Sequence, residues 1–280
     1  MNFTDLKEHI SKIKSEVTND DWISSLDSRK LKELEFHNKD RDISHIEQSK
    51  ANDTYEKFYG NKKYYKTVAR SNNYLNSWIQ KNASKDKVFL DYACGNGGNA
   101  ITACQHGFGL TLGLDISDVS VSNCSSKAGK MGLEDIIFFQ ADAENTLLPD
   151  NSIDHIICSG MLHHLDLSYA IPELRRILKP GGTILAVEAL DINPLIKLYR
   201  YFTPDMRTEW EKAHILDLND IKFAQRFFIL REIKFWHVLG YIGGKLPFLA
   251  KPLDLMDRIL EKIPLLQRLS WIFTFELEKN

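Results

Sequence analysis

The stretch Val88-Phe-Leu-Asp-Tyr-Ala-Cys-Gly-Asn-Gly-Gly-Asn-Ala100 decides the fold of this chain. A short apolar strand runs directly into a glycine-rich turn, and a helix follows. Gly95 and Gly97 have no Cβ atom, so the turn can be tight and a ligand can lie against the backbone. The N-terminus of the helix then presents free N–H groups to polar atoms of that ligand. This order is typical of the nucleotide site of an open α/β sheet.

Short apolar runs alternate with longer helical segments from residue 88 onward, as in a parallel sheet with covering helices. The expected strands are 88–93, 111–115, 136–140, 155–159 and 182–188, with helices at 98–106, 119–131 and 169–178, and two later strands at 227–237 and 271–278. This order predicts an α/β fold, a doubly wound and mostly parallel sheet of seven strands whose last strand is antiparallel. The interval 239–269 is too long for a hairpin and contains an amphipathic pattern at 253–263, so we expect a helical insertion before the final strand.

The part of the chain before residue 86 differs in character. Residues 1 to about 50 are rich in charged and serine side chains, which indicates short surface helices. Residues 54–81 form an aromatic-rich helical stretch, and 82–85 form a polar linker. We therefore divide the chain into a helical N-terminal accessory or cap segment, 1–85, and an α/β domain, 86–280, that carries the insertion 239–269.

The composition of the 280-residue chain restricts its class. Hydrophobic residues make up 43% and charged residues 26%, so the chain can bury a substantial core. The formal net charge of −2 gives no positive field for a phosphate backbone, which argues against nucleic acid as a partner. The N-terminus has no signal-peptide pattern and no window is apolar enough to span a membrane, so we expect a cytoplasmic protein. The oligomeric state has no signal in the sequence.

The cysteines and histidines give no metal pattern. Cys94, Cys104, Cys124 and Cys158 form no C-x-x-C pair, and most lie in apolar or strand-like stretches. We interpret them as reduced and mostly buried, with a role in packing. No spacing of His and Cys matches a zinc site, so no metal is expected.

Acidic residues stand at the ends of three expected strands. Asp91 lies four residues before Gly95, where a carboxylate suits the ammonium group of a bound amino acid and repels a pyrophosphate. Asp115 ends the second strand, where it can accept hydrogen bonds from both ribose hydroxyls. Asp142 follows the third strand, where it can accept the exocyclic amine of adenine. The glycines also match the dinucleotide pattern G-x-G-x-x-A, which by itself leaves a nicotinamide-dependent (NAD or NADP) oxidoreductase open.

Five motifs in order resemble those of the class I S-adenosylmethionine-dependent methyltransferases, type 11 group, which includes the ubiquinone-biosynthesis enzymes. They are Asp91-Tyr-Ala-Cys-Gly-Asn-Gly97, Gly113-Leu-Asp115-Ile-Ser117, Asp142-Ala-Glu144 with Leu148-Pro-Asp-Asn-Ser-Ile-Asp154, Leu162-His-His-Leu165 and Leu178-Lys-Pro-Gly-Gly182. The resemblance covers 88–190 closely and the two late strands loosely. One departure is Ala93, which replaces the first glycine of the family's D-x-G-C-G-x-G. Because alanine is the smallest such change, we expect the cofactor still to fit.

The resemblance implies S-adenosylmethionine as the cofactor. The residues that it places at the cofactor are Asp91, Ala93, Cys94, Gly95, Gly97, Asp115, Ile116, Asp142, Ala143 and Ser159. The implied reaction is methyl transfer to a small-molecule acceptor, and we expect O-methylation of a glycan, a lipid-linked compound or a secondary metabolite. The electrophile is already activated as a sulfonium, so the protein mainly has to align the reacting atoms. A catalytically silent cofactor-binding or scaffold protein on the same fold is the alternative.

A general base is needed only when the acceptor holds its proton, as an alcohol does. The candidates are His164 and His163, just past the fourth strand, at the sheet edge where ligands bind in open α/β folds. We slightly favour His164, and packing under the cofactor is the other interpretation for both. His37 is a third candidate if the N-terminal segment folds over the pocket.

The acceptor pocket is expected to form from 1–80, 190–217 and 239–269, which carry no motif with a known mechanism. The aromatic cluster Tyr55–Tyr65 could line it, because π faces suit a sulfonium, although such stripes are more often core. Arg200 and Arg207 could hold an anionic acceptor, although surface ion pairing is the more common role. Residues 235–269 mix Phe, Trp and Leu with Lys and Arg, which suits contact with a lipid surface, although packing over the sheet edge is more common.

Overall fold

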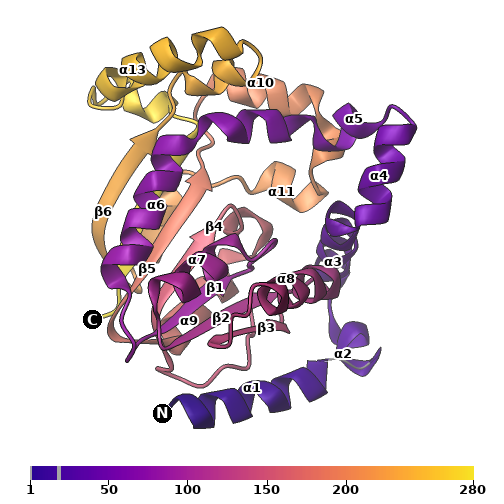
Figure 1. Cartoon of the computed structure of the whole chain (residues 1–280). Coiled ribbons are helices and arrows are strands. Elements are labelled where there is room, and N and C mark those ends of the chain that lie inside the picture. The colour runs from indigo at the N-terminus through magenta and orange to yellow at the C-terminus, as the bar shows by residue number, and fades with distance from the viewer. Residues whose placement is uncertain (1, 18–19) are drawn as a thin grey trace.

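The computed structural model describes residues 2–17 and 20–280 and contains one seven-stranded sheet (Figure 1). Its strands are β1 (Val88–Tyr92), β2 (Leu110–Asp115), β3 (Ile136–Gln140), β4 (Ile153–Ser159), β5 (Leu178–Ala189), β6 (Ile229–Trp236) and β7 (Ile272–Glu278). Their order across the sheet is β3-β2-β1-β4-β5-β7-β6. The pairs among β1 to β5 are parallel, and β7 runs antiparallel to both β5 and β6. The predicted fold class, with its antiparallel last strand, is confirmed.

The strand β5 begins at Leu178, ahead of the predicted start at Gly182. Leu178 pairs with Ile153 at the start of β4, and the register then shifts so that His155 pairs with Thr183. The first residue of β5 is thus held by pairing with the neighbouring strand β4. The sequence did not predict this pairing, because Pro180, Gly181 and Gly182 lie just after Leu178 and both residue types are typical of turns.

Helices cover the two faces of the sheet. One face carries α6 (Ala69–Asn82), α7 (Gly98–His106) and α8 (Asp118–Lys130), and the other carries α1 (Phe3–Val17), α9 (Leu167–Ile177) and α12 (Leu218–Ala224). Successive residues of β1 serve opposite faces, since Phe89 packs with α6 and Leu90 with α1 and α9. The core therefore lies in two layers with the sheet between them.

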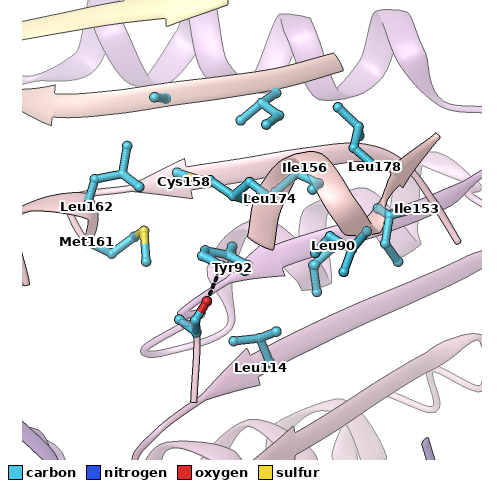
Figure 2. Close-up of a cluster of buried hydrophobic side chains, with 14 of the residues drawn as sticks. Leu90, Tyr92, Leu114, Ile153, Ile156, Cys158, Met161, Leu162, Leu174 and Leu178 are labelled. Carbon is cyan, nitrogen blue, oxygen red and sulfur yellow. Dashed lines mark hydrogen bonds between the residues drawn. The ribbon is translucent and has the colours of Figure 1, made fainter. Parts of the chain in front are cut away.

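The side chain of Tyr92 links β1 to the loop after β3. It is fully buried among apolar side chains of the α9 face, and its hydroxyl donates a hydrogen bond to the carbonyl oxygen of Ala143 (Figure 2). Leu114 of β2 and the consecutive residues Met161 and Leu162 after β4 lie around it (Figure 2). This contact holds the loop that carries Asp142 beside the end of β1.

The N-terminal helices reach both faces of the sheet. In α1 the residues Leu6, Ile10, Ile13 and Val17 are buried against the sheet at helical spacing, so this helix belongs to the core and is not one of the short surface helices that the composition predicted. The chain then continues through α2 (Asp20–Ser25), α3 (Ser28–Arg41), α4 (Ile43–Ala51), α5 (Tyr55–Tyr59) and η1 (Gly60–Thr67) to α6 on the opposite face (Figure 1). Residues 2–17 and 20–82 therefore surround the sheet from the face of α1 to the face of α6.

Two further helical segments follow β5 and β6. The first contains α10 (Pro194–Phe202), η3 (Pro204–Met206) and α11 (Glu209–Ala213), and leads into α12. The second is the expected insertion before the last strand, with η4 (Gly240–Gly244), η5 (Pro247–Leu249), α13 (Ala250–Leu260) and η6 (Gln267–Leu269). None of the helices in the described part of the chain combines the length and apolar character needed to cross a bilayer.

Candidate active site

The turn after β1 has an unusual backbone. Ala93, Gly95 and Gly97 all have positive φ, of 55°, 51° and 66°. A Cβ atom on Gly97 would lie 2.8 Å from the Sγ atom of Cys124 and 3.0 Å from the ring of Phe138. Glycine is therefore required at 97 both for backbone conformation and for space, whereas Ala93 adopts the left-handed region with a side chain.

Asp91 is buried at the end of β1 with its carboxylate directed to the helix that follows. Its Oδ2 atom accepts a hydrogen bond from the backbone N–H of Ala100 at 3.0 Å, and Oδ1 accepts one from the Asn99 side chain at 3.4 Å. Burial raises the pKa of Asp91 to about 7, although these hydrogen bonds oppose the shift. In the described residues no cationic side chain forms an ion pair with this carboxylate, so a ligand cation can supply the missing charge.

Asp115 at the end of β2 is fixed by backbone groups. Its Oδ2 atom accepts from the N–H of Gly95 at 2.8 Å, and Oδ1 accepts from the N–H of Ser117 at 2.9 Å. These bonds join the tip of β2 to the glycine turn after β1. The carboxylate is thereby held at the wall of the same cavity as Asp91.

The acids after β3 are paired with the helix α3. Lys30 Nζ lies 2.7 Å from Asp142 Oδ2, and the guanidinium of Arg29 donates to both oxygens of Glu144 at 2.7 Å. The other oxygen of Asp142 accepts from the backbone N–H of Glu144. The helix α3 thus lies over the strand ends as a roof, attached by three ion pairs to the loop that follows β3.

A cavity of about 210 Å³ lies between the roof α3 and the ends of β1, β2 and β4. It is lined by nine of the ten residues predicted for the cofactor, namely Asp91, Ala93, Cys94, Gly95, Asp115, Ile116, Asp142, Ala143 and Ser159. Gly97 lies outside the lining and instead supports the turn against Cys124. Sequence reasoning missed Arg29, Lys30, Glu33 and Arg41 of α3, because nothing in the local sequence of α3 shows that it covers a strand edge far along the chain.

His163 is part of a buried carboxylate–imidazole pair. Its Nδ1 atom lies 2.7 Å from Glu188 Oε2, and Glu188 Oε1 accepts the backbone N–H groups of Met161 and Leu162, each at 2.9 Å. Because Glu188 accepts all three bonds, Nδ1 carries the proton and Nε2 keeps a lone pair in the neutral ring. Burial favours the neutral imidazole, but the charges of Glu188 and Glu211 outweigh burial and raise the pKa of His163.

His164 is in a different environment from its neighbour. Its Nδ1 atom lies 3.0 Å from Glu33 Oε2 of the roof helix, and its ring packs edge-on against His37. Burial and the adjacent His163 lower the pKa of His164 to about 3, so the ring is neutral. Both His164 and the sequence candidate His37 line the cavity beneath α3, so the N-terminal segment does fold over this pocket.

A second cavity, of about 400 Å³, lies near the first, because the ring centroids of His163 and His164 are 4.4 Å apart. His163 lines it, whereas His164 lines the first cavity. Its walls come from η1, α10, α11, η4 and the residue before β7, and its apolar lining residues include Tyr64, Tyr65, Leu195, Ile196, Tyr199, Ile242, Leu246 and Trp271. Segments far apart in sequence therefore enclose one largely apolar space beside His163.

Charged groups lie at one wall of the second cavity. Arg200 Nη1 is 2.9 Å from Asp191, Arg207 Nε is 3.4 Å from Glu211, and Glu211 Oε1 is 3.9 Å from His163 Nε2. Both arginines are ion-paired, as the sequence suggested, but they line the cavity rather than the outer surface. In the aromatic cluster 55–65, Tyr64 and Tyr65 line the cavity, whereas Tyr59 is buried elsewhere, beside His45.

Residues 90–186 match the family model described as methyltransferase domain. Over 97 residues the chain is 34% identical to the 27-O-demethylrifamycin SV methyltransferase of Amycolatopsis mediterranei, a match that covers 34% of this chain and 36% of that protein. Over 129 residues it is 31% identical to a sterol 24-C-methyltransferase of Neurospora crassa, which covers 45% of this chain and 34% of that protein. The chain thus spans about a third of the length of the curated relatives that it matches.

Solved structures share the fold over a longer stretch. The geranyl diphosphate C-methyltransferase of Streptomyces coelicolor A3(2), solved with Mg²⁺, geranyl diphosphate and S-adenosyl-L-homocysteine, has a TM-score of 0.56 at 12% identity, covering 75% of this chain and 79% of that chain. The cyclase SpnF has a TM-score of 0.54 at 19% identity, covering 74% of this chain and 80% of that chain. At these identities the likeness concerns the fold alone.

Proposed function

Because residues 90–186 belong to the class I S-adenosylmethionine-dependent methyltransferases of the type 11 group, we propose that the chain transfers a methyl group from S-adenosylmethionine to an oxygen atom of a small-molecule acceptor. The observation that carries this proposal is the position of His163. This residue lines a cavity with largely apolar walls, and its ring centroid lies 4.4 Å from that of His164, which lines the cavity with the three strand-end acids. A methyl donor in the first cavity and an acceptor in the second would meet beside this imidazole.

The three acids suit the three polar parts of the cofactor. Asp91, which has no cationic partner in the described residues, would receive the ammonium group of the methionine moiety. Asp115, already held by two backbone N–H groups, would accept the ribose hydroxyls. Asp142 would accept a hydrogen bond from the exocyclic amine of adenine. The ammonium of Lys30, which now contacts the Asp142 carboxylate, would then have to share that carboxylate or move away.

The proposed reaction is a direct displacement at the methyl carbon. The acceptor oxygen forms a bond to that carbon while the carbon–sulfur bond breaks, and the sulfur keeps the electron pair as S-adenosylhomocysteine leaves. The acceptor proton passes to Nε2 of His163, whose other nitrogen donates its proton in a hydrogen bond to Glu188. Glu188 thereby positions the ring and stabilises the imidazolium that forms.

We favour His163 over His164 as the base, although the sequence alone slightly favoured His164. His164 lines the cofactor cavity, packs against His37 and has its pKa lowered to about 3, so it is a poor proton acceptor. His163 lines the second cavity and is paired with a buried carboxylate. For His164 we propose a role in attaching the roof through Glu33.

The second cavity favours an acceptor with an apolar body. Its walls are mainly aromatic and aliphatic, with Arg200, Arg207, Glu211 and Lys245 as the charged exceptions. A lipid-linked or aromatic hydroxyl compound fits this lining better than a glycan, which would leave many hydroxyl groups without partners. The two arginines can then bind an anionic or hydrogen-bond-accepting group of that acceptor.

The test is an assay with S-adenosylmethionine labelled in its methyl group and a panel of phenols and isoprenoid alcohols. We expect methylated product, and we expect His163→Gln to lower kcat by about 10²- to 10⁴-fold, as loss of a general base does. His164→Gln should lose much less activity, and the exposed His106→Gln serves as the control for handling and folding. The wild-type rate should rise with pH through the raised pKa of His163.

Calorimetric titrations with S-adenosylhomocysteine and NADH separate this proposal from its alternatives. We expect the first to bind and the second not to bind. Tight binding of S-adenosylhomocysteine without methyl transfer to any acceptor would support the silent cofactor-binding alternative. The cyclase SpnF has the same fold, so the fold alone does not decide between these outcomes. Binding of NADH in its place would support the oxidoreductase.

A further inference from the structure

Exposed apolar side chains gather on α10 and on the insertion between β6 and β7. Eleven of the eighteen large apolar side chains that are exposed in the described residues belong to 194–202 or 246–265. The most exposed are Tyr201 and Phe202 of α10, at 78% and 71%, and Phe248 and Leu265 of the insertion, both at 77%. An apolar surface of this kind marks a contact with a partner or a membrane.

The two segments lie at the same end of the molecule. In Figure 1 both α10 and α13 stand at the top, beyond the sheet. Asn193, which caps α10, donates a hydrogen bond to the carbonyl oxygen of Leu269 at 2.6 Å, and Leu195 and Leu246 line the same cavity. We call the exposed side chains of 194–202 and 245–268 the docking face.

The inner side of α13 is fixed to the rest of the fold by its acidic residues. Asp257 is fully buried and accepts the backbone N–H groups of Leu239 and Gly240, both at 2.8 Å. Asp254 and Glu261 are ion-paired with Arg70 of α6. The outer side of α13, with Leu255 and Ile259 both 65% exposed, is therefore held facing away from the protein.

Because the acids are paired, the unpaired exposed charges of the insertion are basic. The most exposed charged residues of 239–270 are Lys245, Lys251, Arg258, Lys262 and Arg268. Asp254, whose side chain is 35% exposed, is ion-paired with Arg70 and Arg258. The exposed apolar side chains are thus surrounded by basic groups. Exposed aromatic and aliphatic side chains among lysines and arginines match the interface of an anionic bilayer.

We infer that the docking face binds the surface of a membrane that contains anionic lipids, with its apolar side chains inserted at the boundary of headgroups and acyl chains. A second copy of the chain fits the face less well. A two-fold symmetric contact would bring the basic surface of one copy against the basic surface of the other. A lipid surface instead offers negative headgroups for the cations and hydrocarbon for Phe248 and its neighbours.

The docking face lies next to the second cavity, so membrane binding would bring a lipid substrate to the site. This step rests on the proposed function. Lys245 and Leu246 belong both to the docking face and to the lining of the second cavity. A lipid-linked acceptor could therefore move from the bilayer to His163 without crossing water. The inferred substrate class is an amphiphile with a hydroxyl group in its polar part.

The test is flotation of the full chain with vesicles of phosphatidylglycerol and phosphatidylcholine, compared with phosphatidylcholine alone. We expect binding to the anionic vesicles that weakens as salt is added. Phe248→Ser and Ile259→Ser should each lower the partition coefficient at least about tenfold, because each removes an apolar side chain that the bilayer would bury. Lys251→Glu with Lys262→Glu should abolish the preference for anionic lipid.

The matched controls are Ile43→Ser and Tyr169→Ser, which change side chains that are 62% and 63% exposed outside the docking face. These variants should float like the wild type. Failure of the wild type to float with anionic vesicles would overturn the inference, as would a dimer in sedimentation velocity that Phe248→Ser dissociates. Calorimetry with S-adenosylhomocysteine on the same samples separates the two proposals, because cofactor binding without flotation contradicts only this one, and flotation without cofactor binding contradicts only the proposed function.

Discussion

At the scale of single residues, the carboxylates of the site differ in whether the protein itself supplies their partners. Asp115 and Glu188 are satisfied by backbone N–H groups and by His163 within the protein. Asp91 is satisfied only by weaker neutral donors, and its carboxylate is buried. A buried acid without a cation destabilises the fold when it is ionised, and the ammonium of the cofactor would remove that cost.

Asp91→Asn should weaken binding of S-adenosylhomocysteine about 10- to 100-fold, because a hydrogen bond to a charged group is lost. Since the pKa of Asp91 is raised to about 7 in the folded protein, the free protein loses stability as pH rises from 4 to 7. The variant should therefore be more thermostable than the wild type at pH 8. Calorimetry and thermal unfolding measure the two effects. An affinity of the wild type that does not rise between pH 6 and pH 8 would contradict this role for Asp91.

Glu188→Gln should lower kcat about 10- to 100-fold with little change in KM, because the amide can donate to Nδ1 of His163 and reverse its tautomer. The glutamine oxygen can still accept the backbone N–H groups of Met161 and Leu162, so folding should be preserved. The midpoint of the pH–rate profile should move to lower pH, since Glu188 contributes to the raised pKa of His163. The double variant with His163→Gln should lose no more than His163→Gln alone, and additive losses would place Glu188 outside the proton path.

At the scale of elements, α3 is the feature that turns an open sheet edge into a cavity. Its residues Arg29, Lys30 and Glu33 bind acids and a histidine that lie more than one hundred positions later in the chain. Lys30 occupies the carboxylate proposed for adenine, so the roof and the cofactor compete for Asp142. With the cofactor in the proposed position, Lys30 would have to give up or share its contact with Asp142.

Lys30→Met should raise the affinity for S-adenosylhomocysteine about tenfold, because Asp142 no longer has to release an ion pair before it accepts adenine. The free variant should also unfold at a lower temperature, since a partly buried carboxylate has lost its cation. Lys32→Met, on the exposed side of the same helix, is the matched control and should change neither quantity. A weaker affinity in Lys30→Met would mean that the ammonium itself contacts the cofactor.

At the scale of the whole molecule, the N-terminal helices share the core of the sheet. The helix α1 packs in the same apolar cluster as β1, β2 and β4, and α6 packs in the cluster on the opposite face. The proposed division at residue 85 therefore describes a segment that differs in sequence character but contributes side chains to both layers of the core. Whether 1–85 unfolds together with the α/β domain can be tested by measuring the free energy of unfolding.

Ile10→Ala should lower the free energy of unfolding by about 2–5 kcal/mol, as expected for truncation of a buried isoleucine. Urea unfolding followed by tryptophan fluorescence should show one transition, moved to lower urea concentration. Lys12→Ala, at an exposed position of the same helix, should leave the transition in place. If 1–85 were an independent accessory segment, the main transition of Ile10→Ala would stay where it is in the wild type.

The sequence by itself determined the sheet and the cofactor loops. The run from Val88 to Ala100, the acid at 115 and the acid at 142 are local patterns, and each stands at a strand end because a buried parallel strand is a short apolar run with a polar end. Parallel strands bring these ends to one edge, so nine of the ten predicted cofactor residues line one cavity. The same argument failed at the start of β5, where pairing with β4 overrides a local turn pattern.

Only the tertiary structure decided what covers that edge and which histidine lines the second cavity. His163 and His164 are neighbours in a motif and cannot be ranked by type or spacing. His163 contacts Glu188 at the end of β5 and lines the second cavity. His164 contacts Glu33 of α3 and lines the first cavity. The second cavity likewise depends on contacts between segments distant in sequence, and such contacts follow from the packing of whole elements, which has no local pattern.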